Sequence, residues 1–146
     1  MPTINRTYID TNIWLDVLLD RPLFVEESKS ALAACIDCGI ELLYAATSLK
    51  DIFYLAERSA GPDSAYKAID VVLGLSRIAQ IDSDICSQAR RLERPDYEDG
   101  IIAASALAEQ VDAIISRDEH AFNNLEMPKY TPLEFIELLG YEVIDL

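Results

Sequence analysis

Four aspartates of this chain have the types and positions that an acidic, metal-dependent hydrolase would need. Asp10, Asp51, Asp99 and Asp118 each lie where a strand-like segment passes into a helical pattern. Carboxylates that converge repel one another and raise one another's pKa, and a hard divalent cation removes that penalty. Such a cation lowers the pKa of its bound water and stabilises charge on phosphoryl oxygens. The set therefore predicts hydrolysis of a phosphate ester with one or two Mg²⁺ or Mn²⁺ ions.

Each acid also has a purely structural explanation. Ser48–Asp51, Asp96–Asp99 and Ser116–Glu119 have the three-residue spacing of a capping box, in which side chains satisfy free amides at a helix start. Acids in a first helical turn are favoured by the helix dipole as well. Capping explains any one acid, and we expect Asp96 to cap the helix that starts at Tyr97. It does not explain why acids recur at successive strand ends.

The elements that must position these acids alternate along the chain. Strands are expected over 7–9, 41–45, 77–81 and 111–116, and helices over 13–18, 25–38, 65–73, 83–92, 97–110 and 132–139, with a further helix from Ser48 to the break at Gly61-Pro62. This alternation predicts an α/β fold, a three-layer α/β/α sandwich with a central parallel sheet of the Rossmann-like kind. The carboxyl ends of parallel strands face one crevice, so the acids are expected to meet there.

Length and composition favour a single domain over residues 1–146. With 146 residues, of which 51% are hydrophobic, the chain can bury one core and is too short for two ordinary domains. No segment resembles a signal peptide or a membrane span, so we expect a cytoplasmic protein with no membrane partner. Cys35 and Cys38 are expected to be small buried residues in a helix, with no disulfide.

The net charge of −14 argues against nucleic-acid binding through a generally basic surface. Bound divalent cations can reverse the local electrostatics of an acidic site. The only histidine, His120, is expected to be an exposed residue, so neither a Ser-His-Asp nor a Cys-His arrangement competes with the acidic site.

Three motifs, in order, resemble those of the PIN-domain family. Tyr8–Asn12 (YIDTN) resembles its opening D-x-N motif, and Asp96–Ala106 (DYEDGIIAASA) resembles its third acidic motif. Ser116–Phe122 (SRDEHAF) resembles the T-R-D/N-x-x-x-F motif near the family's C-terminal end. The order, spacing and strand contexts of the motifs agree over nearly the whole chain. The resemblance implies a PIN-like fold.

The resemblance also implies an activity and partners. It implies an Mg²⁺- or Mn²⁺-dependent endoribonuclease that cleaves single-stranded RNA, in particular a VapC-like toxin of a type II toxin–antitoxin pair. RNA is the implied substrate, an antitoxin protein the implied partner, and a homodimer the implied assembly. The excess of negative charge suits an antitoxin that blocks the acidic site with a basic side chain.

The resemblance assigns roles residue by residue. The catalytic acids are Asp10, Asp51, Asp99 and Asp118, of which Asp10, Asp99 and Asp118 are metal ligands. The supporting residues are Asn12, Ser116 and Asp96. Position 51 holds the shorter Asp where the family usually has Glu, and position 116 holds Ser where it usually has Thr.

Basic residues near these motifs are candidates for contact with RNA phosphates. They are Arg117, Arg94 and Lys50, and Arg94 belongs with Arg90 and Arg91 to the densest basic cluster of the chain. The alternative is a solvated face in which each basic side chain pairs with a neighbouring acid.

Two other functions fit the same acids. A receiver-like, Mg²⁺-binding signalling domain would use Asp82 as phosphoacceptor, but it would require a late lysine where the chain has Arg117-Asp118. A catalytically inactive PIN fold would serve as an interaction module. Phosphodonor labelling and RNA cleavage, respectively, separate these readings from the nuclease.

Overall fold

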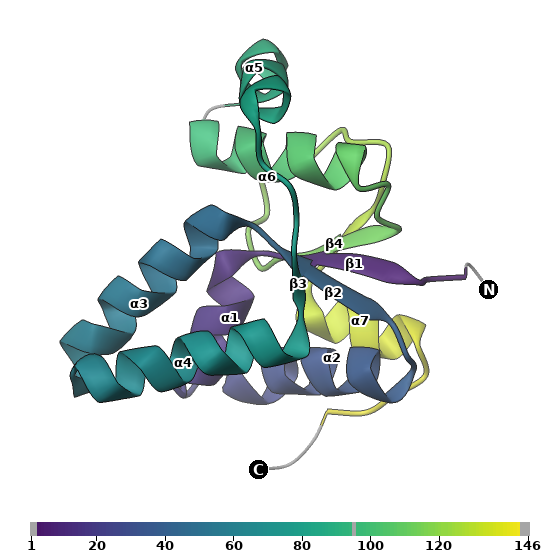
Figure 1. Cartoon of the computed structure of the whole chain (residues 1–146). Coiled ribbons are helices and arrows are strands. Elements are labelled where there is room, and N and C mark those ends of the chain that lie inside the picture. The colour runs from purple at the N-terminus through teal and green to yellow at the C-terminus, as the bar shows by residue number, and fades with distance from the viewer. Residues whose placement is uncertain (1–2, 95, 144–146) are drawn as a thin grey trace.

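A five-stranded parallel sheet runs through the centre of the computed structural model, which describes residues 3–94 and 96–143 (Figure 1). The strand order is β3-β2-β1-β4-β5, and every neighbouring pair is parallel. The strands are β1 (Arg6–Ile9), β2 (Glu41–Tyr44), β3 (Arg77–Ile78), β4 (Ala113–Ile115) and β5 (Lys129–Tyr130).

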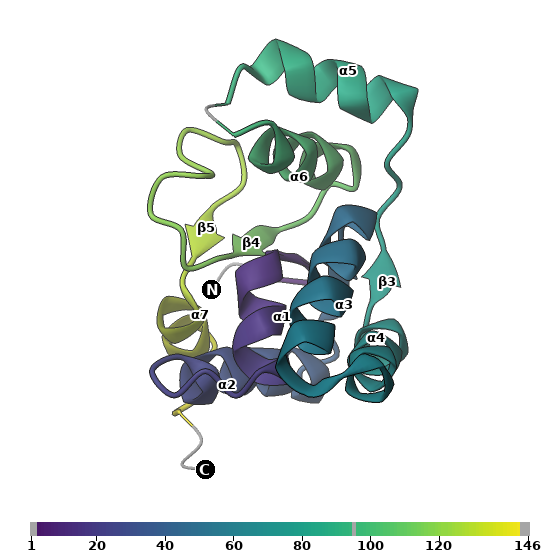
Figure 2. The same ribbon diagram turned by 90° about the vertical axis from the view of Figure 1, so that its left-hand side faces the viewer.

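Helices cover both faces of the sheet and complete the predicted three-layer α/β/α sandwich. The helices are α1 (Thr11–Leu18), α2 (Val25–Asp37), α3 (Ala46–Ala60), α4 (Pro62–Leu75), α5 (Ser83–Leu92), α6 (Tyr97–Ala108) and α7 (Pro132–Leu138). Helices α5 and α6 lie on one face, and α1, α2, α3, α4 and α7 lie on the other (Figures 1 and 2). Among the described residues, no helix is long and apolar enough to cross a membrane.

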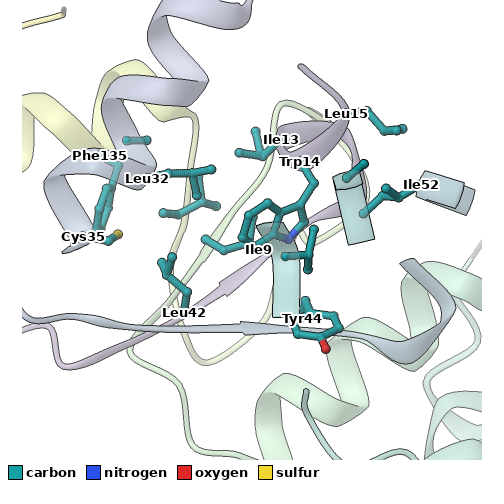
Figure 3. Packing of buried hydrophobic residues seen from close by; sticks show 14 of the residues in the cluster. Ile9, Ile13, Trp14, Leu15, Leu32, Cys35, Leu42, Tyr44, Ile52 and Phe135 are labelled. Atoms are coloured by element: carbon teal, nitrogen blue, oxygen red, sulfur yellow. The ribbon is translucent and has the colours of Figure 1, made fainter. Parts of the chain in front are cut away.

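Alternation along the strands divides the core into two layers. Tyr8 and Ile114 pack with α6, whereas their neighbours Ile9 and Ile115 pack with α1, α2 and α7 on the opposite face. Successive side chains of a strand point to opposite faces, and here both faces are apolar because both are covered. Trp14 of α1 is fully buried within the larger layer (Figure 3).

The strand order creates a topological switch point between β1 and β4. From β1 the chain moves outward to β2 and β3, then returns past β1 to β4 and β5. In open α/β sheets, ligands bind in the crevice at the carboxyl ends of the two strands that flank such a point. Asp10 follows β1 and Ser116 follows β4, so the residues flanking this crevice are those of two predicted motifs.

Several boundaries differ from the prediction. Helix α4 begins at Pro62, directly after Gly61 with its φ of 87°, because proline is well suited to a first helical position. Strand β5 was not predicted, since two residues carry almost no periodic signal. Gly39 has the expected positive φ after α2. Cys35 is buried as expected, whereas Cys38 is exposed, because it lies beyond the last turn of α2.

Candidate active site

Asp10 directly follows β1, at the carboxyl end of a strand that flanks the switch point. It caps α1, and its Oδ1 accepts a hydrogen bond from the Thr11 amide at 2.8 Å. Its Oδ2 accepts a hydrogen bond from Ser116 Oγ at 2.6 Å. The residue is only 7% exposed. Burial raises the pKa of Asp10, the two hydrogen bonds oppose that rise, and the charge of Asp118 adds to it.

The segment after β4 is folded around the side chain of Ser116. Its Oγ is fully buried and accepts the Asp118 amide at 3.0 Å while donating to Asp10. Asp118 Oδ1 in turn accepts the amides of His120 and Ala121 at 2.9 and 3.0 Å. The predicted capping box over Ser116–Glu119 is therefore wrong, since the carboxylate that closes this turn is Asp118 and no helix follows. His120 is exposed, as expected.

Helix α6 brings a second group of acids to the same place. Asp96 caps the helix by accepting the Glu98 amide at 2.9 Å. Burial, aided by the charges of Asp96, Asp10 and Asp118 and opposed by that of Arg94, raises the pKa of Asp99 to about 6. Asp99 therefore lies within electrostatic range of both Asp10 and Asp118.

A close approach between helices anchors the acidic end of α6. Gly100 follows Asp99, and a Cβ at this position would lie 3.2 Å from the Ala89 carbonyl oxygen of α5. That spacing is tighter than an alanine would ordinarily accept, so glycine lets α6 pack directly on α5. The packing fixes the first turn of α6, which carries the acids.

Asp51 lies beside Lys50 and does not form the predicted capping box with Ser48. Helix α3 begins at Ala46 and has no side-chain cap, so the predicted capping box over Ser48–Asp51 is wrong. Ser48 Oγ instead lies 2.6 Å from Thr11 Oγ1, which ties α3 to α1. The side chain of Asp51 is 34% exposed and lies 3.6 Å from Lys50 Nζ.

Glu98 is a site residue that the sequence analysis did not select. Burial, together with the charge of Asp51 and a hydrogen bond between the two carboxyl groups, raises its pKa to about 7. The charges of Asp96 and Asp10 act in the same direction. The available signal was its place inside the third acidic motif, directly before Asp99. The acids from α3 and α6 thus form one continuous group with Asp10.

The basic residues differ in what they can reach. Arg117 is bound to Asp16 through Nε and Nη2, at 2.7 and 2.8 Å, so the structure supports the alternative that pairs it with a neighbouring acid. Arg94 acts electrostatically on Asp99 and donates to the Asn123 carbonyl at 2.6 Å. Lys50 is 83% exposed next to Asp51. Of these three candidates, Lys50 is exposed beside Asp51, and Arg94 is partly exposed within electrostatic range of Asp99.

Two buried oxygens at this edge of the sheet lack a hydrogen-bond partner within the described part of the chain. They are Asn12 Oδ1 in the first turn of α1 and Thr47 Oγ1 in the first turn of α3. Buried polar atoms almost always have a partner, which can be an ordered water. Unpartnered oxygens beside carboxylates are suited to a hydrated cation.

The donor set fits a hard divalent cation in its chemistry. All of the candidate ligands are oxygens, the ligands that Mg²⁺ and Mn²⁺ prefer. Across residues 3–94 and 96–143, however, no three His, Cys, Asp or Glu side chains converge closely enough to hold a metal ion. The acids are neighbours around Asp10 without forming a closed cage.

Comparison with known proteins identifies one matching family. The model of the PIN domain matches residues 6–120, which span every strand except β5 and all of the acids described above. A search of curated proteins finds no match.

Solved structures resemble the fold over most of its length. VapBC2 from Rickettsia felis, bound to a DNA fragment from its promoter, has a TM-score of 0.69 at 14% identity, with 86% of this chain and 98% of that chain covered. A toxin–antitoxin complex from Klebsiella pneumoniae has a TM-score of 0.68 at 23% identity, covering 86% and 97%. The Sarcin-Ricin loop cleaving toxin VapC20 from Mycobacterium tuberculosis has a TM-score of 0.67 at 16% identity, covering 79% and 92%.

Proposed function

Because this chain belongs to the PIN domain family, we propose that it is a metal-dependent endoribonuclease that hydrolyses phosphodiester bonds of single-stranded RNA. The observation that carries the proposal is the grouping of Asp10, Asp99 and Asp118 at the topological switch point. Asp10 follows β1, Asp99 lies in α6 and Asp118 lies in the segment after β4, and their charges act on one another.

The proposed metal ligands are Asp10, Asp99 and Asp118. A bound Mg²⁺ or Mn²⁺ would supply a water of lowered pKa and stabilise charge on the phosphoryl oxygens. Asp51 acts from the α3 side together with Glu98, since the two carboxyl groups share a hydrogen bond. This arrangement can serve one ion or two, because the charge of Asp10 acts both on Asp99 and on Glu98, the partner of Asp51.

Supporting residues hold the ligands and the substrate. Ser116 fixes one oxygen of Asp10 through a 2.6 Å hydrogen bond, and Asp96 caps the helix that carries Asp99. Asn12 Oδ1, buried without a partner among the described residues, would accept a hydrogen bond from water at the site. Arg94 and Lys50 supply positive charge for the RNA phosphates, which the net charge of −14 would otherwise repel.

We further propose that the protein is the toxin of a type II toxin–antitoxin pair and forms a cytoplasmic homodimer of one PIN-like domain, residues 1–146. Similar solved structures include VapBC complexes and a toxin–antitoxin complex. An acidic site with a strongly negative charge suits a basic antitoxin segment. Exposed aromatic side chains such as Tyr54 and Tyr66, which are 58% and 63% exposed, suit a protein interface.

The receiver-like alternative gains no support from the geometry. Asp82, its candidate phosphoacceptor, caps α5 by accepting the Ile85 amide at 3.0 Å and also accepts Gln80 Nε2 at 2.9 Å. Its carboxylate is thus engaged at a helix start. An inactive PIN interaction module remains the competing function that experiment must separate from the nuclease.

The decisive experiment measures cleavage of single-stranded RNA with Mg²⁺, with Mn²⁺ and with a chelator. We expect the wild-type protein to cleave only with metal, and Asp99→Asn to lose cleavage while keeping its circular dichroism spectrum. The matched control is Asp84→Asn, which makes the same change in the first turn of α5 at an exposed position. Cleavage by Asp99→Asn at the wild-type rate would contradict the proposed active site. A folded wild type that cleaves no RNA would favour the interaction module.

A further inference from the structure

Asp16 is a buried carboxylate that the proposed active site does not use. It lies on α1 with 0% exposure. Its Oδ2 accepts hydrogen bonds from Ser28 Oγ and Arg117 Nε, both at 2.7 Å, and its Oδ1 accepts one from Arg117 Nη2 at 2.8 Å. Arg21 Nη1 lies 3.6 Å from Oδ1. A buried charge is costly unless it is paired and hydrogen-bonded, and Asp16 is both.

The guanidinium of Arg117 is held on its edge and on its face. Its edge makes the two parallel hydrogen bonds to Asp16, the geometry in which arginine binds a carboxylate most specifically. Its face lies over Phe24, with Cζ 3.7 Å from the ring centroid. The side chain is only 22% exposed. A group held this way has one orientation available to it.

The Asp16–Arg117 pair closes a ring of contacts around the site. Asp10 caps α1, the helix that carries Asp16. Arg117 stands between Ser116 and Asp118 in the chain, and Ser116 Oγ donates to Asp10 at 2.6 Å. The ring therefore runs from Asp10 along a rigid helix to the ion pair and back through Ser116. It fixes the segment that carries Asp118 relative to Asp10.

Stability alone does not explain a charged pair at this place. Replacement of a buried ion pair by apolar side chains of similar volume is often neutral or stabilising, because desolvation offsets the attraction. A bidentate pair additionally fixes the orientation of its two side chains. It also occupies a guanidinium that, without Asp16, would be free to pair with the site carboxylates of Asp10 and Asp118.

Under the proposed function, in which Asp10 and Asp118 are metal ligands, we propose that Asp16 and Arg117 are positioning residues for divalent cation binding. They hold the two ligand-bearing segments at the separation the cation requires and keep the guanidinium away from the carboxylates. Residues that orient metal ligands through hydrogen bonds typically change metal affinity about 10- to 100-fold when they are replaced.

The test is calorimetric titration of Mn²⁺ into the whole chain without RNA. Asp16→Asn, which removes the charge, and Arg117→Lys, which keeps a charge but loses the fork, are each expected to weaken Mn²⁺ binding about 10- to 100-fold. Arg21→Gln is the matched control. It also removes a cationic partner of Asp16, but Arg21 does not belong to the segment that carries Asp118. Its Mn²⁺ affinity should equal that of the wild type.

Urea unfolding, followed through the buried Trp14, separates this role from a structural one. A purely structural role would lower the urea midpoint of the variants and leave the affinity of the folded protein for Mn²⁺ unchanged. If Asp16→Asn does not fold, Ser28→Ala removes a single hydrogen bond to the same carboxylate and should weaken binding about threefold.

The two proposals fail in different ways. A folded wild type that binds no Mn²⁺ would overturn the proposed function and this inference with it. A wild type that binds Mn²⁺, together with folded Asp16 and Arg117 variants that bind it equally well, would overturn only the positioning role.

Discussion

Asp99→Asn should stabilise the metal-free protein although it removes a proposed metal ligand. Burial, aided by the charges of Asp96, Asp10 and Asp118, raises the pKa of Asp99 from 3.8 to about 6. The folded state therefore binds a proton more tightly than the unfolded state does. The contribution of this group to stability is present below the unfolded pKa and is lost as the pH rises from about 4 through 6. At pH 8 the ionised Asp99 opposes folding.

The magnitude follows from the same shift. Two pKa units correspond to about 3 kcal/mol, and because Asp99 is only partly buried, solvent screening reduces the expected effect to about 1 kcal/mol. Urea unfolding with a chelator, followed through Trp14 fluorescence, should show Asp99→Asn more stable than wild type by about 1 kcal/mol at pH 8 and equal to it near pH 4. The control Asp84→Asn, at an exposed position of α5, should change stability by less than about 0.5 kcal/mol at either pH.

A variant that is less stable than wild type at pH 8, or a difference that does not change with pH, would refute the reasoning. Addition of Mn²⁺ completes the test. The wild type should gain stability in proportion to the logarithm of the Mn²⁺ concentration, whereas Asp99→Asn should gain far less. The substitution would then rank above the wild type without metal and below it with metal.

Three further outcomes follow from single contacts. Ser116→Ala removes the 2.6 Å hydrogen bond to the buried Asp10 carboxylate. Urea unfolding should therefore show a free energy of unfolding lower by about 2 kcal/mol, and calorimetry should show a weaker Mn²⁺ affinity. Unchanged values for both would contradict the role given to this bond. Thr131→Ala removes the capping box of α7 and should cost about 1 kcal/mol in the same assay with Mn²⁺ affinity intact, and a lost affinity would mean that α7 acts on the site. Gly100→Ala places a Cβ 3.2 Å from the Ala89 carbonyl and should lower RNA cleavage by displacing Asp99, which a variant as active as wild type would disprove.

The parts of the fold that could be predicted from sequence are those with local signals. The spacing of apolar residues predicted the order of strands and helices, because this spacing differs between a helix and a strand and can be read within each element. The placement of Asp10 and Ser116 at strand ends followed, and a parallel sheet then brings such ends to one edge. Strand β5 was missed because two residues after Pro128 show no period.

The contacts that sequence could not predict are those between distant side chains. Asp16 and Arg117 are 101 positions apart, and nothing local to either one marks the other as its partner. The capping box assigned to Ser48 failed because α3 begins two residues earlier, at Ala46, which turns the Ser48 hydroxyl toward Thr11. Spacing alone cannot fix a helix start to within two residues.

Glu98 illustrates a third kind of limit. The motif Asp96–Asp99 contains three acids, and sequence resemblance favours Asp96 and Asp99. Which acid turns toward Asp51 depends on the rotation of α6, which is set by its packing on α5 at Gly100. That rotation joins Glu98 to Asp51 and leaves Asp99 facing Asp10 and Asp118.

The central claim is that RNA is cleaved at a cation held by these carboxylates, and the most direct measurement is the rate of cleavage of single-stranded RNA against Mn²⁺ concentration for wild type and Asp10→Asn. The account predicts a saturable dependence on Mn²⁺ for wild type, no cleavage in chelator, and a loss of at least about 100-fold in Asp10→Asn at every concentration, equivalent to about 2.7 kcal/mol of transition-state stabilisation. Cleavage that persists in chelator, or that proceeds equally in Asp10→Asn, would contradict it.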